Sequence, residues 1–281
     1  MNFYYVNSRN ERIDLSDYPY LFQSGNLLDY SWSYEASNNR IRNVKKEAAE
    51  RNFSVALIPA FNGTKEERQQ ELLIAANRIF EVFEYDVINN VNGRLFTDTG
   101  YFLPCRIISS EKSNWRLGIP FQQQKFTVIS DVNYWIQEKM REFLPYALSN
   151  EAGGLDFTFD YPFDYTSGKT GLSYWHIGHY DSCDFKMKIY GPCEDPVIYI
   201  NGHKYAVNCS LEAGSYLTIN SLEGTIIKTA PNSDVISLFN NRNKESNVFE
   251  PLPSKPLTLS WNGLFGFDLT AFVKRSEPSW N

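Results

Sequence analysis

The C-terminal part of the chain is a succession of short, strand-like runs separated by turn residues. The runs are 197–200, 203–207, 216–220, 225–229, 257–261 and 264–272. Short strands at regular spacing, with Gly, Pro and Asn between them, are typical of a β-sandwich. Such a chain offers sheets, edges and turns, and it shows no convergent cluster of polar residues of the kind that catalysis requires. We therefore expect a protein that works by assembly.

Length and aromatic content point the same way. The chain has 281 residues, which is near the length at which single hydrophobic cores usually split, so two domains are expected. Aromatic residues make up 16% of the sequence, and these side chains fit pleated, half-buried surfaces better than helical bundles. The predicted fold class is mainly β.

Charge and hydropathy exclude several classes of protein. The formal net charge is −6, and no basic stripe of the kind that tracks nucleic acid is visible. The first residues lack the pattern of a secretory signal, and the most apolar run, 55–61, is broken by Pro59 and too short to cross a bilayer. We expect synthesis in a cytoplasm and no membrane partner.

The four cysteines, Cys105, Cys183, Cys193 and Cys209, contain no Cys-x-x-Cys pair. In a reducing compartment they would be small apolar residues with free thiols, which is the prediction here. Cys183 and Cys193 flank a predicted strand and turn, so a disulfide between them is the alternative.

One segment, about 65–88, predicts a helix. Thr64 and Glu67 form a capping box, in which each side chain pairs with the other residue's backbone N–H. An apolar stripe follows at intervals of three and four residues. The stripe is Leu72, Leu73, Ala76, Ile79, Phe80 and Phe83, and the opposite face carries Glu66, Arg68, Gln69, Gln70 and Arg78.

The remaining segments divide into strands, a hairpin and a loose linker. Residues 126–130 predict a strand, and 134–143 fit a strand or a short helix, with the strand favoured because Tyr134 and Trp135 have low helix propensity. Asn201-Gly202 predicts a tight type I′ hairpin between its flanking runs. Composition shifts to Pro, Gly, Ser and Asp between 144 and 170, which predicts domains 1–145 and 146–281.

Two clusters resemble catalytic or metal sites. His176 and His179 have chelating spacing, but their surroundings are not helical and no third ligand has suitable spacing. Asp156, Asp160 and Asp164 would share one face of an extended strand, and glycosidases use two such carboxylates. They lie in a stretch rich in Pro and Gly, where acidic residues usually solvate a loop.

Other motifs fail on inspection. Ser167-Gly168-Lys169-Thr170 imitates the end of a phosphate-binding loop, but the glycine required before it is Phe163. No Gly-x-Ser-x-Gly elbow occurs. Tyr174 and Trp175 could stack on sugar rings, although such residues are more often core or interface. We assign no catalytic, cofactor-binding or metal-binding residues and no cofactor.

Taken together and in order, several motifs resemble the distal tail proteins of long-tailed phages that infect Gram-positive bacteria. In the first half they are Leu-Leu-Asp-Tyr-Ser-Trp-Ser-Tyr at 27–34, Asn-Gly-Arg-Leu-Phe at 92–96 and Tyr-Phe-Leu-Pro-Cys at 101–105. In the second half they are Tyr-Pro-Phe-Asp-Tyr at 161–165, the run 185–192, Asp-Pro-Val-Ile-Tyr-Ile-Asn-Gly at 195–202, Val-Phe-Glu-Pro-Leu-Pro at 248–253 and Arg-Ser-Glu-Pro-Ser-Trp at 275–280.

This resemblance implies an architecture and a set of partners. Residues 1–145 would be a ring-forming α+β domain with one helix on a sheet, and 146–281 a galectin-like β-sandwich. A homo-hexameric ring at the distal tip of the virion tail would join the tail tube protein to the tail-tip hub, the tail-associated lysin and the receptor-binding proteins. DNA would pass through the lumen without specific binding, and the protein would be made in the bacterial host cytoplasm.

Three hypotheses about the ring contact and the function follow. Strands around 27–34 and 101–108 are expected to contribute to ring closure. The alternative function is a carbohydrate-binding β-sandwich that recognises cell-wall saccharide, with Trp175 as the residue to test. A glycosidase that uses Asp156 and Asp164 is the third and weakest hypothesis.

Overall fold

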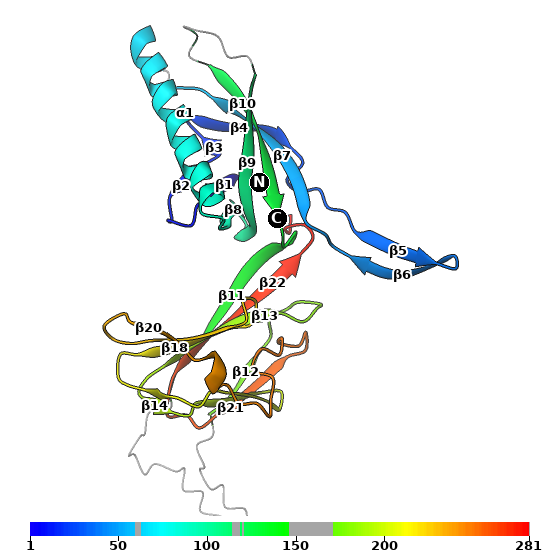
Figure 1. The fold of residues 1–281 in the computed structure, drawn as a ribbon, viewed down its shortest axis with the longest axis vertical. Helices are drawn as coiled ribbons and strands as arrows, with labels where there is room; N and C mark the ends of the chain where they lie inside the picture. The colour runs from blue at the N-terminus through cyan, green and yellow to red at the C-terminus, as the bar shows by residue number, and fades with distance from the viewer. Residues whose placement is uncertain (60–62, 114–118, 120, 146–170, 281) are drawn as a thin grey trace, which may run out of the picture. The chain divides into compact units, whose positions relative to one another are not determined.

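The structure is a computed structural model that describes residues 1–59, 63–113, 119, 121–145 and 171–280. The chain is mainly β, and it divides into two compact units (Figure 1). Unit 1 comprises Met1–Gln137 and Lys274–Asn281, and unit 2 comprises Glu138–Val273. The chain therefore leaves unit 1 within one strand and returns to it within another.

Unit 1 combines antiparallel strands with the α-helix α1 (Lys65–Ile88). Its strands are β1 (Phe3–Val6), β2 (Arg12–Asp14), β3 (Ser16–Asp17), β4 (Tyr20–Gly25), β5 (Ser33–Ser37), β6 (Arg40–Lys45), β7 (Ala49–Leu57), β8 (Gly93–Thr97), β9 (Tyr101–Ser113), β10 (Gln122–Ser130) and the start of β11 (Trp135–Phe143). The order β9-β10-β7-β4-β3 forms one sheet, and β2-β1-β8 continues from the other end of β9. Because β9 pairs with β10 through its C-terminal half and with β8 through its N-terminal half, the sheet curls around one core.

The helix covers that core, and its N-terminus confirms the predicted capping box. Glu67 N–H donates to Thr64 Oγ1 over 3.3 Å, and Thr64 N–H donates to Glu67 Oε2 over 2.7 Å. The predicted apolar stripe is only partly right. The buried residues are Leu72, Ala75, Ile79, Val82, Phe83 and Asp86.

Leu73 and Phe80 of the predicted stripe are instead exposed. The helix is oriented with the carboxylate of Asp86 facing the core, because Tyr5 and Ser8 supply hydroxyl donors to it at 2.6 Å. Sequence periodicity could not reveal this, since it treats every aspartate as a surface residue.

Unit 2 is a sandwich of two antiparallel sheets. The first has the order β20-β19-β18-β13-β22 and the second β12-β21-β15-β16, and one apolar core lies between them. The elements are β12 (Gly171–Trp175), β13 (Asp184–Tyr190), β14 (Cys193–Glu194), β15 (Val197–Ile200), β16 (His203–Ala206), β17 (Ser210–Leu211), β18 (Tyr216–Asn220), β19 (Thr225–Thr229), β20 (Val235–Ser237), the 3-10 helix η1 (Phe239–Asn241), β21 (Leu257–Trp261) and β22 (Phe267–Arg275).

Several local predictions are confirmed in this part of the chain. Asn201 and Gly202 have φ angles of 50° and 84°, as a type I′ turn requires, and they join β15 to β16. The ambiguous segment 134–143 contains the strand β11.

The division into units differs from the boundary expected at 145/146. It falls inside β11, and 274–281 return to unit 1, where Trp280 lies near Phe3 and Leu28. Loop composition marks linkers, but it cannot show that β22 carries the chain back.

The described helices include none long and apolar enough to span a membrane.

Candidate functional site

The residues that sequence analysis weighed for chemistry do not converge. His176 and His179 follow β12 in an irregular segment, and no group of three or more potential metal ligands occurs in the described part of the chain. The carboxylates Asp156, Asp160 and Asp164 and the tetrapeptide 167–170 lie outside the described residues.

Burial raises the thiol pKa of three of the four cysteines, Cys105, Cys193 and Cys209. Each of the four is described, and each is a free thiol. Burial raises the pKa of Cys105 to about 12 and that of Cys193 to about 11, so both remain protonated at neutral pH. The prediction of free thiols is confirmed.

One exposed apolar structure in unit 1 is the hairpin formed by β5 and β6, residues 33–45, which we call the arm. Among the described strands, β5 and β6 pair only with each other, and they extend away from the rest of unit 1 (Figure 1). Asn38 and Asn39, with φ angles of 52° and 58°, form its two-residue turn. An isolated two-stranded hairpin is marginally stable in water, so this structure calls for a partner.

A β-bulge gives the arm one apolar face. Tyr34 pairs with Val44, and the register then shifts so that Ala36 pairs with Ile41. Without the bulge, Arg42 would oppose Ala36 and Ile41 would point to the other face. Tyr34 and Ile41 are each 65% exposed and Val44 is 54% exposed, so this face has no cover within the described residues.

The base of the arm is held by a lysine in an aromatic cage. Lys46 Nζ lies 4.4 Å from the ring centroid of Tyr134, 5.3 Å from that of Tyr30 and 5.4 Å from that of Trp32. It also donates to the backbone carbonyl of Asn133 over 3.0 Å. Burial, helped by repulsion from Arg51, lowers the pKa of Lys46 to about 8, so the ammonium is still mainly charged at neutral pH.

The helix presents a second apolar surface. Its exposed apolar residues are Leu73, Ile74, Phe80, Val87 and Ile88. Beside them a groove of about 220 Å³ runs between α1 and β9, which we call the helix groove. Its lining is Phe80, Phe83, Glu84, Val87, Ile107, Ile108, Ser109, Ser110, Lys112 and Phe126.

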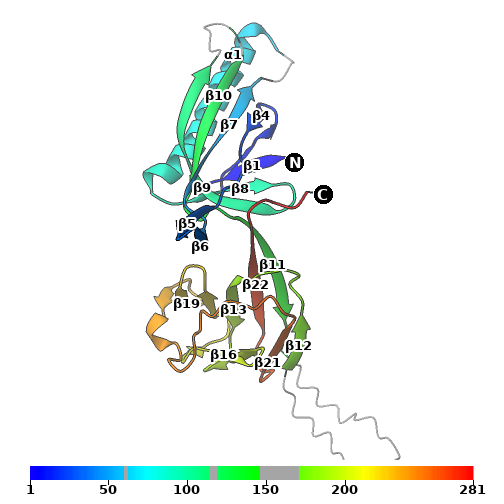
Figure 2. The same ribbon diagram turned by 90° about the vertical axis from the view of Figure 1, so that its right-hand side faces the viewer.

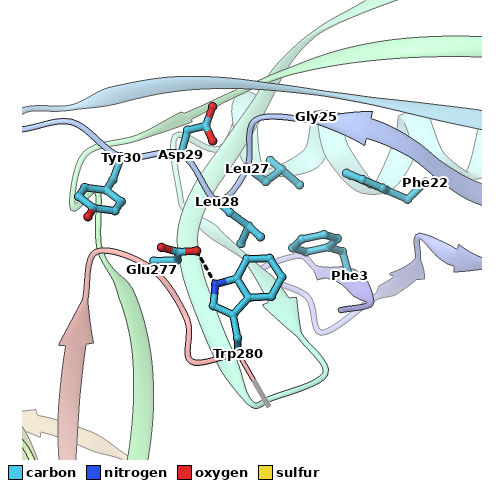
Figure 3. Close-up of a pocket in the computed structure, with 9 residues that line it drawn as sticks. All are labelled: Phe3, Phe22, Gly25, Leu27, Leu28, Asp29, Tyr30, Glu277 and Trp280. Carbon is cyan, nitrogen blue, oxygen red and sulfur yellow. Dashed lines mark hydrogen bonds between the residues drawn. The ribbon is translucent and has the colours of Figure 1, made fainter.

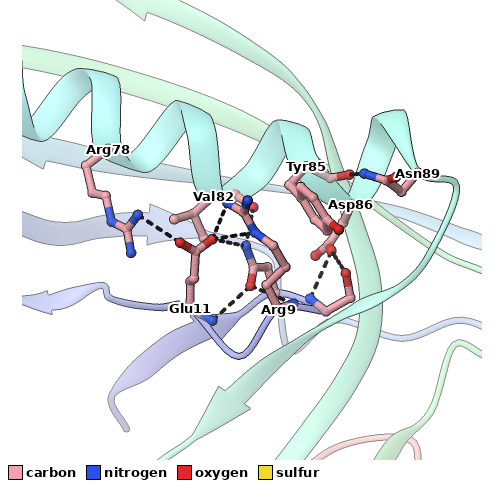
Figure 4. Close-up of polar contacts among 9 residues, drawn as sticks. Arg9, Glu11, Arg78, Val82, Tyr85, Asp86 and Asn89 are labelled. Atoms are coloured by element: carbon pink, nitrogen blue, oxygen red, sulfur yellow. Dashed lines mark hydrogen bonds and ion pairs between the residues drawn. The ribbon is translucent and has the colours of Figure 1, made fainter.

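Polar contacts fix the helix to the β1–β2 turn (Figure 4). Asp86 accepts from the hydroxyls of Tyr5 and Ser8, both at 2.6 Å. Glu11 bridges Arg9 at 2.6 Å and Arg78 at 3.1 Å, and hydrogen bonds from Asn7 first, then Arg9 and Arg78, lower the pKa of Glu11 to about 2. The helix that lines the groove is therefore attached to the β1–β2 turn by several contacts.

A third surface hollow also belongs to unit 1. It has a volume of about 610 Å³, and Figure 3 shows the Trp280 ring beside Leu28 and Phe3, with the Trp280 indole N–H donating to Glu277 over 2.6 Å. The end of the chain is thus part of this surface.

The surfaces expected from the sequence are placed only in part. Leu27 is buried in the unit 1 core and 26–32 form a turn and irregular chain, so of the segment 27–34 only Ser33 and Tyr34 belong to a strand. The second segment, 101–108, lies in β9, and its last two residues line the helix groove. Sequence analysis missed the arm. Its one local signal is the Asn38-Asn39 pair, because asparagine tolerates positive φ.

No family model matches this sequence, and no curated protein does. Solved structures, however, are similar over nearly its whole length. A chain of the phage P2 baseplate in its activated conformation with Ca has a TM-score of 0.63 and 13% identity, covering 99% of each chain. A chain of the p2 baseplate with Sr gives 0.64 and 13%, with the same coverage.

The third similar structure is the SPP1 Dit protein, a paradigm of the hub adsorption apparatus in phages that infect Gram-positive bacteria. Its TM-score is 0.58 at 8% identity, covering 97% of this chain and 99% of that one. The fold is that of phage baseplate and hub proteins. This baseplate and hub fold confirms the predicted fold class and the predicted resemblance in architecture. At such identities, the comparison shows the fold alone.

Proposed function

We propose that the chain is a structural virion protein, a distal tail protein that forms a hexameric ring at the far end of a long phage tail. The ring joins the tail tube protein to the tail-tip hub, the tail-associated lysin and the receptor-binding proteins, and it leaves a channel for DNA. The observation that carries this proposal is similarity along nearly the whole chain to the SPP1 hub protein and to P2 baseplate chains.

Two physical features support assembly as the function. The arm and the helix groove expose contiguous apolar side chains, which in soluble proteins usually mark interaction sites. The net charge of −6 suits a lumen through which DNA slides, because a basic lining would retain the phosphates. On this proposal the protein is made in the host cytoplasm, ends in the virion and has no catalytic role.

Size and shape in solution test the proposal. Light scattering of the full chain across a concentration series is expected to give the mass of six subunits, and negative-stain images should show an annulus with a central hole. A monomer at every concentration tested would contradict the ring.

The carbohydrate-binding alternative needs a different test residue from the one the sequence indicated. Trp175 packs partly against the core of unit 2, so its removal would disturb folding as well as any sugar contact. Tyr174 and Tyr199 are exposed on the second sheet of unit 2. A glycan array with the full chain and with Tyr174→Ala would support this alternative only if the substitution abolished clear binding.

A further inference from the structure

We propose that the arm of one copy binds in the helix groove of the next copy. Tyr34, Ile41 and Val44 would pack against the apolar lining of the groove, and the arginines of the arm would face the glutamates of α1. This inference rests on the proposed ring and names the contact that closes it.

The apolar surfaces of the two sites are of matching character. The arm places Tyr34, Ala36, Ile41 and Val44 on one face, and the described residues of its own chain leave that face in solvent. The groove offers Phe80, Val87 and Ile108, each more than one third exposed, around a hollow of about 220 Å³. Covering both would remove apolar area from water on each side, and it would supply the support that a two-stranded hairpin lacks.

The charges are complementary as well. Arg40 and Arg42 sit at the tip of the arm, exposed and without an ion pair among the described residues, whereas Lys45 already pairs with Glu35 and Glu47.

On the helix, Glu81 and Glu84 are exposed one turn apart, and neither has an ion pair in the part of the chain that the structure describes. Lys112 is a cation in the same groove lining, but it belongs to β9 and not to the helix. Two unpaired guanidinium groups thus match two unpaired carboxylates, which argues for a second copy of this chain as the occupant.

The positions of the arm and the helix groove on unit 1 also suit a ring. In Figures 1 and 2 the helix lies on one side of the unit 1 sheet, and the arm leaves from the other. A contact between two different surfaces of the same subunit is head-to-tail, and it closes into a ring when the rotation between neighbours divides a full turn. The arm cannot pair with itself across a two-fold axis and use these charges, because both of its unpaired charges are positive.

Charge reversal with rescue tests the pairing in the full chain. R40E/R42E and E81R/E84R are each expected to shift the mass measured by light scattering from ring to monomer. The variant that carries all four substitutions should recover the ring, because the two charge sets are then exchanged. The control K244E/K255E reverses two positive charges, as R40E/R42E does, but at exposed lysines of unit 2, and it is expected to leave the ring intact.

A second measurement tests the contact directly, in case a charge-reversal variant loses the ring because it misfolds. Ile41→Cys and Val87→Cys in separate chains, mixed and treated with a short bis-maleimide, should give covalent dimers, and neither variant alone should. Circular dichroism of every variant is expected to match the parent chain, whereas thermal unfolding of the monomeric variants should move to lower temperature because the subunit contact is lost.

The outcomes separate this inference from the proposed function. If the parent chain is monomeric throughout, both the ring and this contact are overturned. If the ring forms but survives both charge reversals, or if the fourfold variant stays monomeric and the mixed cysteine chains do not cross-link, the ring stands. In that case the arm has another occupant.

Discussion

Unit 2 and unit 1 each contain a hairpin with a two-residue type I′ turn, and the two hairpins differ in whether their apolar side chains are buried. In β15–β16, Ile198, Ile200 and Tyr205 are buried in the sandwich core. In the arm, the corresponding apolar face is open to solvent. The local sequences are similar in kind, because both hairpins carry apolar residues on either side of an Asn-containing turn. The difference shows that a hairpin can form without the burial of its apolar face, because local turn geometry sets the first and tertiary packing sets the second.

The comparison would break if the two hairpins contributed equally to folding. Ile198→Ala should destabilise the monomer by about 3 kcal/mol, since it removes a fully buried side chain from the core. Ile41→Ala should change monomer stability by less than about 0.5 kcal/mol, because its side chain is mostly exposed. Urea unfolding under monomeric conditions measures both. A loss for Ile41→Ala as large as that for Ile198→Ala would show that the arm packs within its own subunit.

The turns sharpen the comparison. Gly202 has a φ of 84°, and a Cβ added there meets nothing within 4 Å, so the cost of Gly202→Ala is backbone strain of about 1 kcal/mol. In the arm, Asn39→Gly replaces a strained residue by one without strain, and it is expected to be neutral or stabilising. Denaturation midpoints of the two variants should therefore move in opposite directions or differ clearly. Equal destabilisation would contradict the assigned turn conformations.

The base of the arm offers a third test. Lys46→Met removes the cation from the cage of Tyr30, Trp32 and Tyr134, which should cost about 1 kcal/mol locally. Faster amide hydrogen exchange in β5 and β6 would report the loosening. Lys45→Met is the matched control, because its ion pairs are solvent-exposed and contribute little. If Lys45→Met loosens the arm as much as Lys46→Met, the cage is not what holds it.

The smallest expected effect concerns the helix that faces the arm in the proposed ring. The folded-state pKa of Glu11, about 2, lies below its ordinary value of 4.5, so its contribution to stability is fully present above pH 4.5 and lost as pH falls towards 2.

As pH falls through that window, the Glu11→Gln variant should therefore lose less stability than the parent chain. Thermal unfolding at a series of pH values measures both. Glu35→Gln, in the arm, is the control and should leave the acid dependence unchanged. Identical acid curves for Glu11→Gln and the parent would contradict the role assigned to the Arg9, Asn7 and Arg78 contacts.

Sequence patterns could predict features that depend on neighbours in the chain. The capping box at Thr64 and Glu67, the helix that follows, and the turn at Asn201-Gly202 are confirmed because the groups that stabilise them lie within a few residues of each other. The orientation of the helix was predicted incorrectly, because the hydroxyls that bury Asp86 come from residues about eighty positions earlier.

The candidate site was harder to predict for the same reason. The helix groove lies between α1 and β9, which are brought together only by folding. The apolar face of the arm depends on a one-residue register shift, which the alternation of apolar and polar residues does not reveal. His176, His179 and Trp175 drew attention by residue type, which says little about surroundings.

By itself, the sequence determined that this chain is mainly β, with one amphipathic helix and tight Asn-containing turns, because propensity, capping and turn geometry act over short separations. Only the tertiary structure decided which apolar surfaces are covered and which are left open, and that the C-terminal residues return to unit 1. Burial depends on contacts between residues far apart in the chain, and those contacts exist only once the chain has folded.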